Sequence, residues 1–411
     1  MIGNISAERA SRAVEFGMYR DGDNNLDSIQ AAVIDQAKRS SAKDPALEFT
    51  VEDTTRRNGF AGEGMLRTEQ YTIADGDVSS NVKMTPAHDM SSRSDLAKFV
   101  ATTLDNAGAA NAKQTWIDLI DHGGGDAGGL QSDHGTHHIM REDDMAGAIA
   151  DGIAMHAKAH PEDAARGVDG VVANQCLMAT LGFADALSKV GVKYLAASPE
   201  TMLAPGVPTS VADDIAKHID DASAMAKAVV NTTMSTHYNA GPGMRFGPAA
   251  AFDVLDLDPK KIGAMEASVS TLNAALTNAA GHATQLAAIK SDAKHVDGMV
   301  RFPDGKGMPW QADRPAIALY GTLAADARLD ASVRSAAAQA KNDVASLVMA
   351  HRESGSFAPF DGADYRDAVG PTVHFPIAPK QVDPWAAGGI SETDNNFYKT
   401  VGEGDVTRVF A

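Results

Sequence analysis

The chain alternates short apolar segments with segments of helical periodicity. Four segments have the apolar content of a buried strand: Val14–Tyr19, Trp116–Ile120, Gly170–Ala173 and Lys193–Ala197. Helical patterns lie between them, for example over Glu142–Ala159. Strands that are joined through helices by short loops form a largely parallel sheet with helices on both faces. The sequence therefore predicts an α/β/α sandwich.

Further elements are expected on both sides of these strands. Before residue 210 we expect helices at Leu26–Lys38, Ser94–Leu104 and Leu177–Val190, with Ser94 as the N-cap of the second. In the same part of the chain we expect a strand at Leu47–Val51 and a hairpin of Met65–Ile73 with Val78–Met84. After about Ser210 they are Ala-rich helices at Val211–Asn231, Pro259–Ala280 and Leu329–His351, and a late strand at Thr372–Pro376. We therefore expect a core of residues 1–210 and a helix-rich region of residues 211–411 that completes or packs on it.

The 411 residues include a single cysteine, Cys176. One cysteine excludes an intramolecular disulfide and any Cys-cluster metal or iron–sulfur site. Cys176 is therefore either an inert buried residue or a reactive thiol. The chain carries 36 Lys+Arg against 54 Asp+Glu, a net charge of −18. This acidic balance argues against nucleic-acid binding, which needs a basic face to displace counterions.

The sequence has no pattern of a membrane anchor. The N-terminal residues lack a basic region followed by an apolar one, and no apolar run reaches the ~18 residues of a membrane span. We expect no membrane association and, by default, a cytoplasmic location, with export by a route other than Sec left open. The sequence has no coiled-coil heptad and does not decide the oligomeric state, for which our expectation is a monomer.

Two of the predicted strands end in reactive residues. His122 follows the strand Trp116–Ile120, and Cys176 follows the strand Gly170–Ala173. In a parallel sheet, functional groups gather at the carboxyl ends of the strands. A thiol at a helix N-terminus has a lowered pKa, and a nearby imidazole can act as general base and then protonate a leaving amine. The alternatives without catalysis are that Cys176 is a small core residue and His122 an exposed loop histidine, and the residues alone leave both open.

Five motifs, in one order, resemble those of clostripain-like cysteine peptidases, which are relatives of the caspases, gingipains and legumains. They are the His motif Asp121-His122-Gly123-Gly124-Gly125, the Cys motif Asn174-Gln175-Cys176-Leu177-Met178, the first-strand ending Tyr19-Arg20-Asp21-Gly22-Asp23-Asn24-Asn25-Leu26, the segment Ala197-Ser198-Pro199-Glu200 followed by Pro205-Gly206, and the late strand Gly370-Pro371-Thr372-Val373-His374-Phe375-Pro376. The resemblance extends from about Val14 to Phe410. It implies a caspase-like fold and a cysteine endopeptidase that cleaves protein or peptide substrates.

The resemblance also implies roles for individual residues. Cys176 would be the nucleophile, and His122 its general base and acid. The backbone N–H groups of Gly123 and Cys176 would stabilise the oxyanion, and Asp121 would be structural because this family needs no third catalytic acid. No cofactor would be required.

One position departs from the family pattern. The family commonly has an acidic residue two positions before the cysteine, where it selects Arg or Lys at P1, and this chain has Asn174 there. Glu200 is a candidate to restore an acidic pocket wall, with Ser198 and Asp21 as further substrate-binding candidates. Without it, Asn174 would favour a polar, uncharged P1 residue. A catalytically altered or inactive scaffold protein of the same fold is the alternative.

Three other patterns suggest sites. Calcium-loop spacing is present at Asp21, Asp23, Asn25 and Asp27, although Leu26 and Ala32 stand where Gly and Glu are needed. The turn is interpreted as structural or pocket-forming, with a bound Ca²⁺ as the alternative; some members of the family depend on calcium. A metal site is disfavoured for His134, His137 and His138, because they lie in a Gly-rich loop and not on one helix face, where i, i+4 spacing would present two imidazoles together. Self-processing in the segment Lys158–Gly170 would cut at Lys158 or Arg166, and the alternative is an ordinary helix–strand connection.

Overall fold

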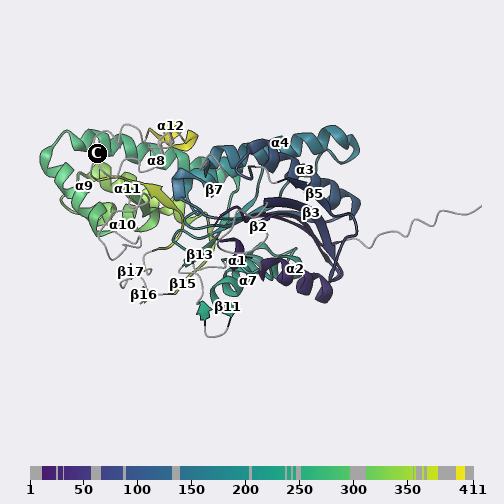
Figure 1. Cartoon of the computed structure of the whole chain (residues 1–411). Coiled ribbons are helices and arrows are strands. Elements are labelled where there is room, and N and C mark those ends of the chain that lie inside the picture. The colour runs from purple at the N-terminus through teal and green to yellow at the C-terminus, as the bar shows by residue number, and fades with distance from the viewer. Residues whose placement is uncertain are drawn as a thin grey trace, which may run out of the picture.

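The structure is a computed structural model of the whole chain, and it describes residues 12–24, 26–30, 32–56, 66–86, 89–131, 139–202, 206–236, 238–241, 244–246, 251–296, 312–354, 356–357, 363–364, 368–377 and 395–402. A ten-stranded sheet lies at its centre (Figure 1). Its strands are β1 (Val14–Asp21), β2 (Leu47–Arg56), β3 (Leu66–Ala74), β4 (Asp77–Val78), β5 (Lys83–Pro86), β6 (Gln114–Ile120), β9 (Gly170–Asn174), β10 (Tyr194–Ala197), β13 (Ala251–Asp256) and β15 (Val348–Glu353).

Most of this sheet is parallel. Its order is β15-β13-β10-β9-β6-β1-β2-β3-β4, with β5 paired to β3. The five strands β10, β9, β6, β1 and β2 run parallel to one another. The strands β3 and β13 are antiparallel to β2 and β10, and β15 is antiparallel to β13. The expected strands, and the expected hairpin that corresponds to β3 with β4 and β5, are therefore confirmed.

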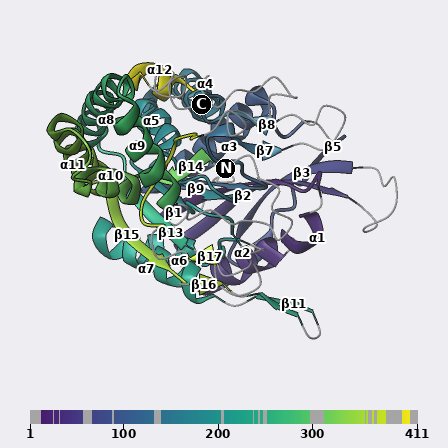
Figure 2. The same ribbon diagram turned by 90° about the vertical axis from the view of Figure 1, so that its left-hand side faces the viewer.

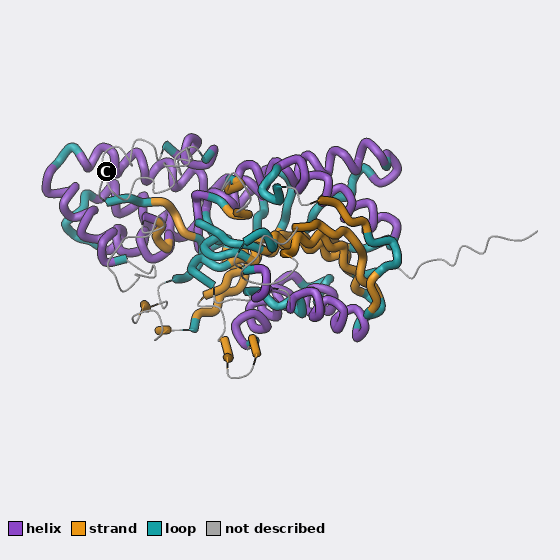
Figure 3. Tube along the Cα trace, viewed as in Figure 1, coloured by secondary structure: helices purple, strands orange, loops and turns teal. Residues whose placement is uncertain are grey.

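Helices cover both faces of the sheet, as the tube in Figure 3 shows. On one face lie α3 (Arg93–Ala109), α4 (Glu142–Ala159) and α5 (Leu181–Lys189); on the other lie α2 (Ala32–Lys43), α6 (Val211–Lys217) and α7 (Ala222–Ser235). Successive strand residues point to opposite faces. In β1, Tyr19 therefore joins the core under α3 and α4, while Phe16 and Met18 join the core under α2 and α6. This arrangement confirms the α/β/α sandwich.

The helix-rich part of the chain lies beside the sheet (Figure 2). It comprises α8 (Pro259–Ala280), α9 (Ala283–His295), α10 (Ala316–Ala325) and α11 (Ala331–Ala345), with α12 (Asn396–Val401) packed on α8 and α5. Their apolar side chains join the core under α3 and α4. Two strands that follow residue 210, β13 and β15, belong to the central sheet, so this part of the chain contributes to the core.

The remaining elements are short. They are α1 (Asp27–Gln30), the single 3-10 turns η1 (Gly125–Ala127) and η2 (Pro161–Asp163), and the two-stranded pairs β7 (Gly129–Gln131) with β8 (Ile139–Met140), β11 (Tyr238–Gly241) with β12 (Met244–Phe246), β14 (Asp313–Pro315) with β18 (Thr372–His374), and β16 (Ser356–Phe357) with β17 (Ala363–Asp364). Among the described residues, no helix is both long and apolar enough to cross a membrane.

Several expected helices differ from the observed ones. The predicted helix Val211–Asn231 is two helices, because the Asp221 side chain caps a new one by accepting from Ala224 N at 3.0 Å. The predicted helix Leu329–His351 ends at Ala345, and its last residues form β15, whose partner β13 is distant in sequence. At its start, α3 has Ser92 and not Ser94 as its N-cap.

Candidate active site

The two reactive residues follow adjacent strands of the parallel sheet. The register pairs Ile120 of β6 with Asn174 of β9, so the loops that carry His122 and Cys176 leave the sheet at the same edge. The neighbouring strand β10 ends at this edge too, with Ala197 opposite Ala173. The structure therefore brings together the His and Cys segments, as the strand-end argument predicts.

The backbones of the two loops touch at Gly123. A Cβ atom at position 123 would lie 3.0 Å from Cys176 N and even closer to the Cys176 carbonyl oxygen. It would also lie 3.0 Å from Gln175 Cβ. Only a residue without a side chain fits such an approach. The two N–H groups expected to hold an oxyanion, those of Gly123 and Cys176, thus belong to contacting segments.

Cys176 is a half-buried free thiol. Its Sγ accepts a hydrogen bond from Met202 N at 3.3 Å. Burial raises the pKa of the Cys176 thiol, and the Met202 bond opposes this only in part. The expected lowering of this pKa by a helix N-terminus is wrong, because α5 begins at Leu181, with Thr180 as its N-cap, and not at Leu177. The chain instead turns sharply after the cysteine, where Leu177 has φ 68°.

The turn after β1 contacts the loop that carries His122. Asn24 Nδ2 donates to Asp121 Oδ1 at 2.5 Å, and Asp121 N donates to Asn174 O at 3.4 Å. On the other side of the loop, Leu130 N donates to the His122 carbonyl at 3.2 Å. Asp121 is buried. Its contacts agree with the structural role that the resemblance implies, and they fix the backbone on both sides of the half-buried His122.

Asn174 makes backbone contacts with both ends of its amide. Its Nδ2 donates to Val207 O at 3.0 Å, and its Oδ1 accepts from Val207 N at 2.7 Å. The side chain is 1% exposed, and a Cβ at Gly206 would collide with its Oδ1. Asn174 therefore joins the Cys loop to the loop after β10.

The other three expected substrate-binding residues are also buried. Asp21 Oδ1 accepts from Asp23 N at 2.9 Å and shapes the turn after β1. Ser198 Oγ donates to the carbonyl of Glu200 at 2.8 Å, and that carbonyl also accepts from Leu177 N at 3.0 Å. Ser198 and Glu200 thus build the loop on which the Cys segment rests.

Glu200 belongs to a group of buried carboxyls directly behind the two loops. The others are Asp126, Glu142 and Asp313. Burial raises the pKa values of Asp126, Glu142 and Glu200, and the charge of Asp313 adds to the effect in each. Within the described part of the chain, the Glu200 carboxyl oxygens have no hydrogen-bond partner. Sequence reasoning missed this group, because its members are far apart in the chain and share no motif.

The remaining sequence candidates have different outcomes. In the proposed calcium loop, the Asp27 carboxylate faces Arg20 at 2.6 Å, and Asn25 lies outside the described residues. His134, His137 and His138 also lie outside them. Lys158 is exposed on the last turn of α4, whereas Arg166 donates to Asp163 Oδ2 at 2.5 Å and to Ala112 O at 2.8 Å.

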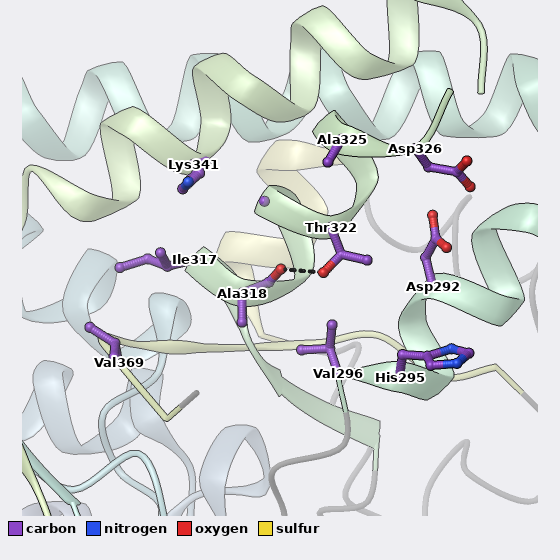
Figure 4. A pocket seen from close by; sticks show the side chains of 11 residues that line it. Asp292, His295, Val296, Ile317, Ala318, Thr322, Ala325, Asp326, Lys341 and Val369 are labelled. Carbon is purple, nitrogen blue, oxygen red and sulfur yellow. Dashed lines mark hydrogen bonds between the residues drawn. The ribbon is translucent and has the colours of Figure 1, made fainter. Parts of the chain in front are cut away.

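A cavity of about 660 Å³ lies away from these residues, among α9, α10 and α11 (Figure 4). Asp292 and Asp326 face one another at one end of it, and Lys341 lies at the other. The pKa of Asp292 is raised to about 6 by burial and by Asp326. Its lining residues come from α9, α10, α11 and the segments beside them, and Cys176 and His122 are not among them.

The fold is similar to that of C11, or clostripain-family, cysteine proteases. A secreted C11 cysteine protease from Bacteroides thetaiotaomicron, solved with an irreversible peptide inhibitor, has a TM-score of 0.62 at 13% identity, covering 96% of this chain and 100% of that one. An inactive zymogen C11 protease from Parabacteroides distasonis has a TM-score of 0.58 at 15% identity, covering 95% and 99%.

A secreted C11 cysteine protease from Bacteroides thetaiotaomicron named iotapain is also similar, with a TM-score of 0.61 at 12% identity, covering 95% of this chain and 99% of that one. Comparison with protein-family models found no match, and comparison with curated proteins found none either. The likeness lies in the fold, and it confirms the caspase-like architecture that the motifs imply.

Proposed function

We propose that the chain is a cysteine endopeptidase in which Cys176 is the nucleophile and His122 the general base and acid. The observation that carries this proposal is the contact of Gly123 with the Cys176 backbone, which holds the two loops together at the edge of the sheet. The C11 fold of the chain supports it. A protein that only binds partners would need neither a thiol nor an imidazole at these strand ends.

The proposed reaction has two half-reactions. His122 takes the Cys176 proton as Sγ attacks the peptide carbonyl, and the N–H groups of Gly123 and Cys176 stabilise the oxyanion. His122 then protonates the leaving amine, and the thioester remains. Water, deprotonated by His122, attacks the thioester; the acid leaves and the thiol regains its proton. Because burial raises the thiol pKa, we propose that proton transfer accompanies attack instead of preceding it.

For P1 we propose a basic residue whose cationic end meets Glu200. The Glu200 carboxyl is buried and has no hydrogen-bond partner among the described residues, so a cationic group beside it would stabilise its charged form. A guanidinium or ammonium group that binds there would lower the raised pKa of Glu200 and ionise the carboxyl. We favour Glu200 over Asn174 for this contact because the Asn174 amide already bonds to Val207 at both ends. The alternative is a polar, uncharged P1 residue.

The test is cleavage of a peptide library with mixed P1 residues by the wild type, Cys176→Ala, His122→Ala and Glu200→Gln. We expect cleavage after Arg or Lys by the wild type, none by the first two variants, and a loss of basic preference in Glu200→Gln. Cleavage that persists in Cys176→Ala would refute the thiol mechanism. A chelator arm tests our proposal that no cofactor, Ca²⁺ included, is required.

An inactive scaffold is the second candidate, and the raised thiol pKa is the observation that favours it. Absence of cleavage by the wild type, together with slow alkylation of Cys176 by iodoacetamide, would support the scaffold. Fast alkylation would favour an enzyme whose substrate the library lacks.

Self-processing and location are also proposals. Lys158 is the more accessible candidate for a cut, because the Arg166 side chain is engaged by Asp163 and Ala112. Mass spectrometry of active enzyme after long incubation tests this, with Cys176→Ala as control, and an intact active chain would refute it. Two of the similar structures are described as secreted, so we favour export over the cytoplasm. We propose that the protein acts as a monomer, which sedimentation measurements can test.

A further inference from the structure

Two histidines and a carboxylate meet far from Cys176, where α3 and α4 end. Asp105 lies on α3, His156 lies on the last turn of α4, and His160 is the C-cap residue of α4. The two helices pack side by side (Figure 1). They lead into the first residues of β6 and β9, whereas His122 and Cys176 follow the last residues of these strands. The group therefore lies at the opposite edge of the sheet from the candidate active site.

The distances in this group suit a metal ion with nitrogen ligands. His156 Nδ1 is 2.7 Å and His160 Nε2 is 3.3 Å from the same atom, Asp105 Oδ1. In the described part of the chain, this is the one group of three or more His, Cys, Asp or Glu residues whose ligand atoms all lie within 4.8 Å of one another. Zinc–ligand bonds of about 2.1 Å in a tetrahedron place the ligand atoms about 3.4 Å apart, so small side-chain rotations suffice.

Each histidine turns its second ring nitrogen to another carboxylate. His156 Nε2 is 3.6 Å from Asp163 Oδ2, and His160 Nδ1 is 3.4 Å from Glu162 Oε1. Arg166 holds Asp163 in place through its Nε. A carboxylate on the outer nitrogen orients a metal-binding imidazole, fixes its tautomer and makes it a stronger ligand. Asp163 and Glu162 stand in this second position for His156 and His160.

Burial and helix direction add to the case. The His156 side chain is 1% exposed, which limits its freedom, while those of Asp105 and His160 are 43% and 42% exposed and leave the site open to an ion from solvent. The C-terminal ends of α3 and α4 carry partial negative charge, which favours a cation. Two imidazoles and one carboxylate favour Zn²⁺ over Ca²⁺ or Mg²⁺, which prefer oxygen ligands.

We propose that Asp105, His156 and His160 bind one Zn²⁺ ion, with Asp163 and Glu162 orienting the two histidines. His156 and His160 have i, i+4 spacing at the end of α4. Asp105, the carboxylate on α3, comes close to these two histidines only because α3 packs on α4. The ion would tie the end of α3 to the beginning of the segment Lys158–Gly170. This proposal does not rest on the peptidase activity.

The experiment is calorimetric titration of the full-length Cys176→Ala protein with Zn²⁺, because this substitution removes the only thiol as a competing ligand. We expect one ion per chain with a dissociation constant in the micromolar range or tighter. Tetrahedral visible absorption of bound Co²⁺ is a second readout. His160→Ala and Asp105→Asn, which alter half-exposed side chains, should weaken binding at least about 100-fold, and Glu162→Gln about 10-fold.

Two controls complete the design. His282→Ala alters an exposed histidine at the N-cap of α9 and should leave the affinity unchanged. Combined substitution of His134, His137 and His138 by alanine should also leave it unchanged. Circular dichroism verifies that each variant is folded. The proposal is overturned by the absence of stoichiometric binding, by binding that His160→Ala and Asp105→Asn do not weaken, or by binding that the loop substitutions abolish.

Discussion

Gly123→Ala tests how closely the two loops must approach. The added Cβ would lie 3.0 Å from Cys176 N, where an ordinary contact is 3.4–4 Å, and closer still to the Cys176 carbonyl oxygen. Both opposing atoms are backbone, so no side chain can rotate away and the loops must separate by roughly 1 Å. A misplacement of that size can lower a catalytic rate about 100-fold. The strain should also cost about 1–3 kcal/mol of stability.

The assay measures kcat/KM on a cleaved library peptide, the alkylation rate of Cys176, and the free energy of unfolding in urea. Gly263→Ala is the matched control, because a Cβ at this α8 position meets nothing within 4 Å. The control should keep full activity and gain up to about 1 kcal/mol from the helix propensity of alanine. If Gly123→Ala retained wild-type kcat/KM and stability, the contact would not hold the site together.

Three further predictions concern buried groups. Asn174→Asp should lower the free energy of unfolding in urea by about 1–3 kcal/mol and create no preference for a basic P1 residue. The substitution removes the donor to Val207 O and places a second carboxyl beside the buried Asp118. An equally stable variant with new Arg/Lys specificity would contradict this. Alkylation of Cys176 should still accelerate above pH 9, since burial raises the thiol pKa, and a plateau below pH 7 would instead indicate a preformed thiolate. The pKa of Asp185 is raised from 3.8 to about 7 by burial, so its contribution to stability is complete below about pH 4 and is lost as the pH rises through 7. The free energy of unfolding of the wild type, relative to that of Asp185→Asn, should therefore be larger at pH 4 than at pH 8. A difference that does not change with pH would refute the shift.

The local pattern of the sequence determines much of this fold. The helices Glu142–Ala159 and Pro259–Ala280 have the predicted bounds, because their periodicity and ends are local properties. The strand ends at His122 and Cys176 are also readable, since apolar runs followed by turn residues mark where a buried strand stops. From parallel order alone, the two loops are expected at one edge of the sheet.

Only the tertiary structure decided which groups meet. The segment Val348–His351 is predicted as the end of a helix but belongs to the strand β15, because β13 offers it a ladder of hydrogen bonds. The Asn174 side chain makes two hydrogen bonds to the backbone of Val207, which is 33 residues away in the chain. Burial raises the pKa of the Cys176 thiol, and α5 starts at Leu181, too late for its N-terminus to lower this pKa.

The same holds for the two clusters of polar groups. The buried carboxyls Asp126, Glu142, Glu200 and Asp313 come from separate parts of the chain. So does Asp105, which reaches His156 and His160 only when α3 packs on α4. Sequence periodicity records which face of an element is apolar. It does not record which distant element covers that face, and burial, hydrogen-bond partners and pKa values all depend on that covering.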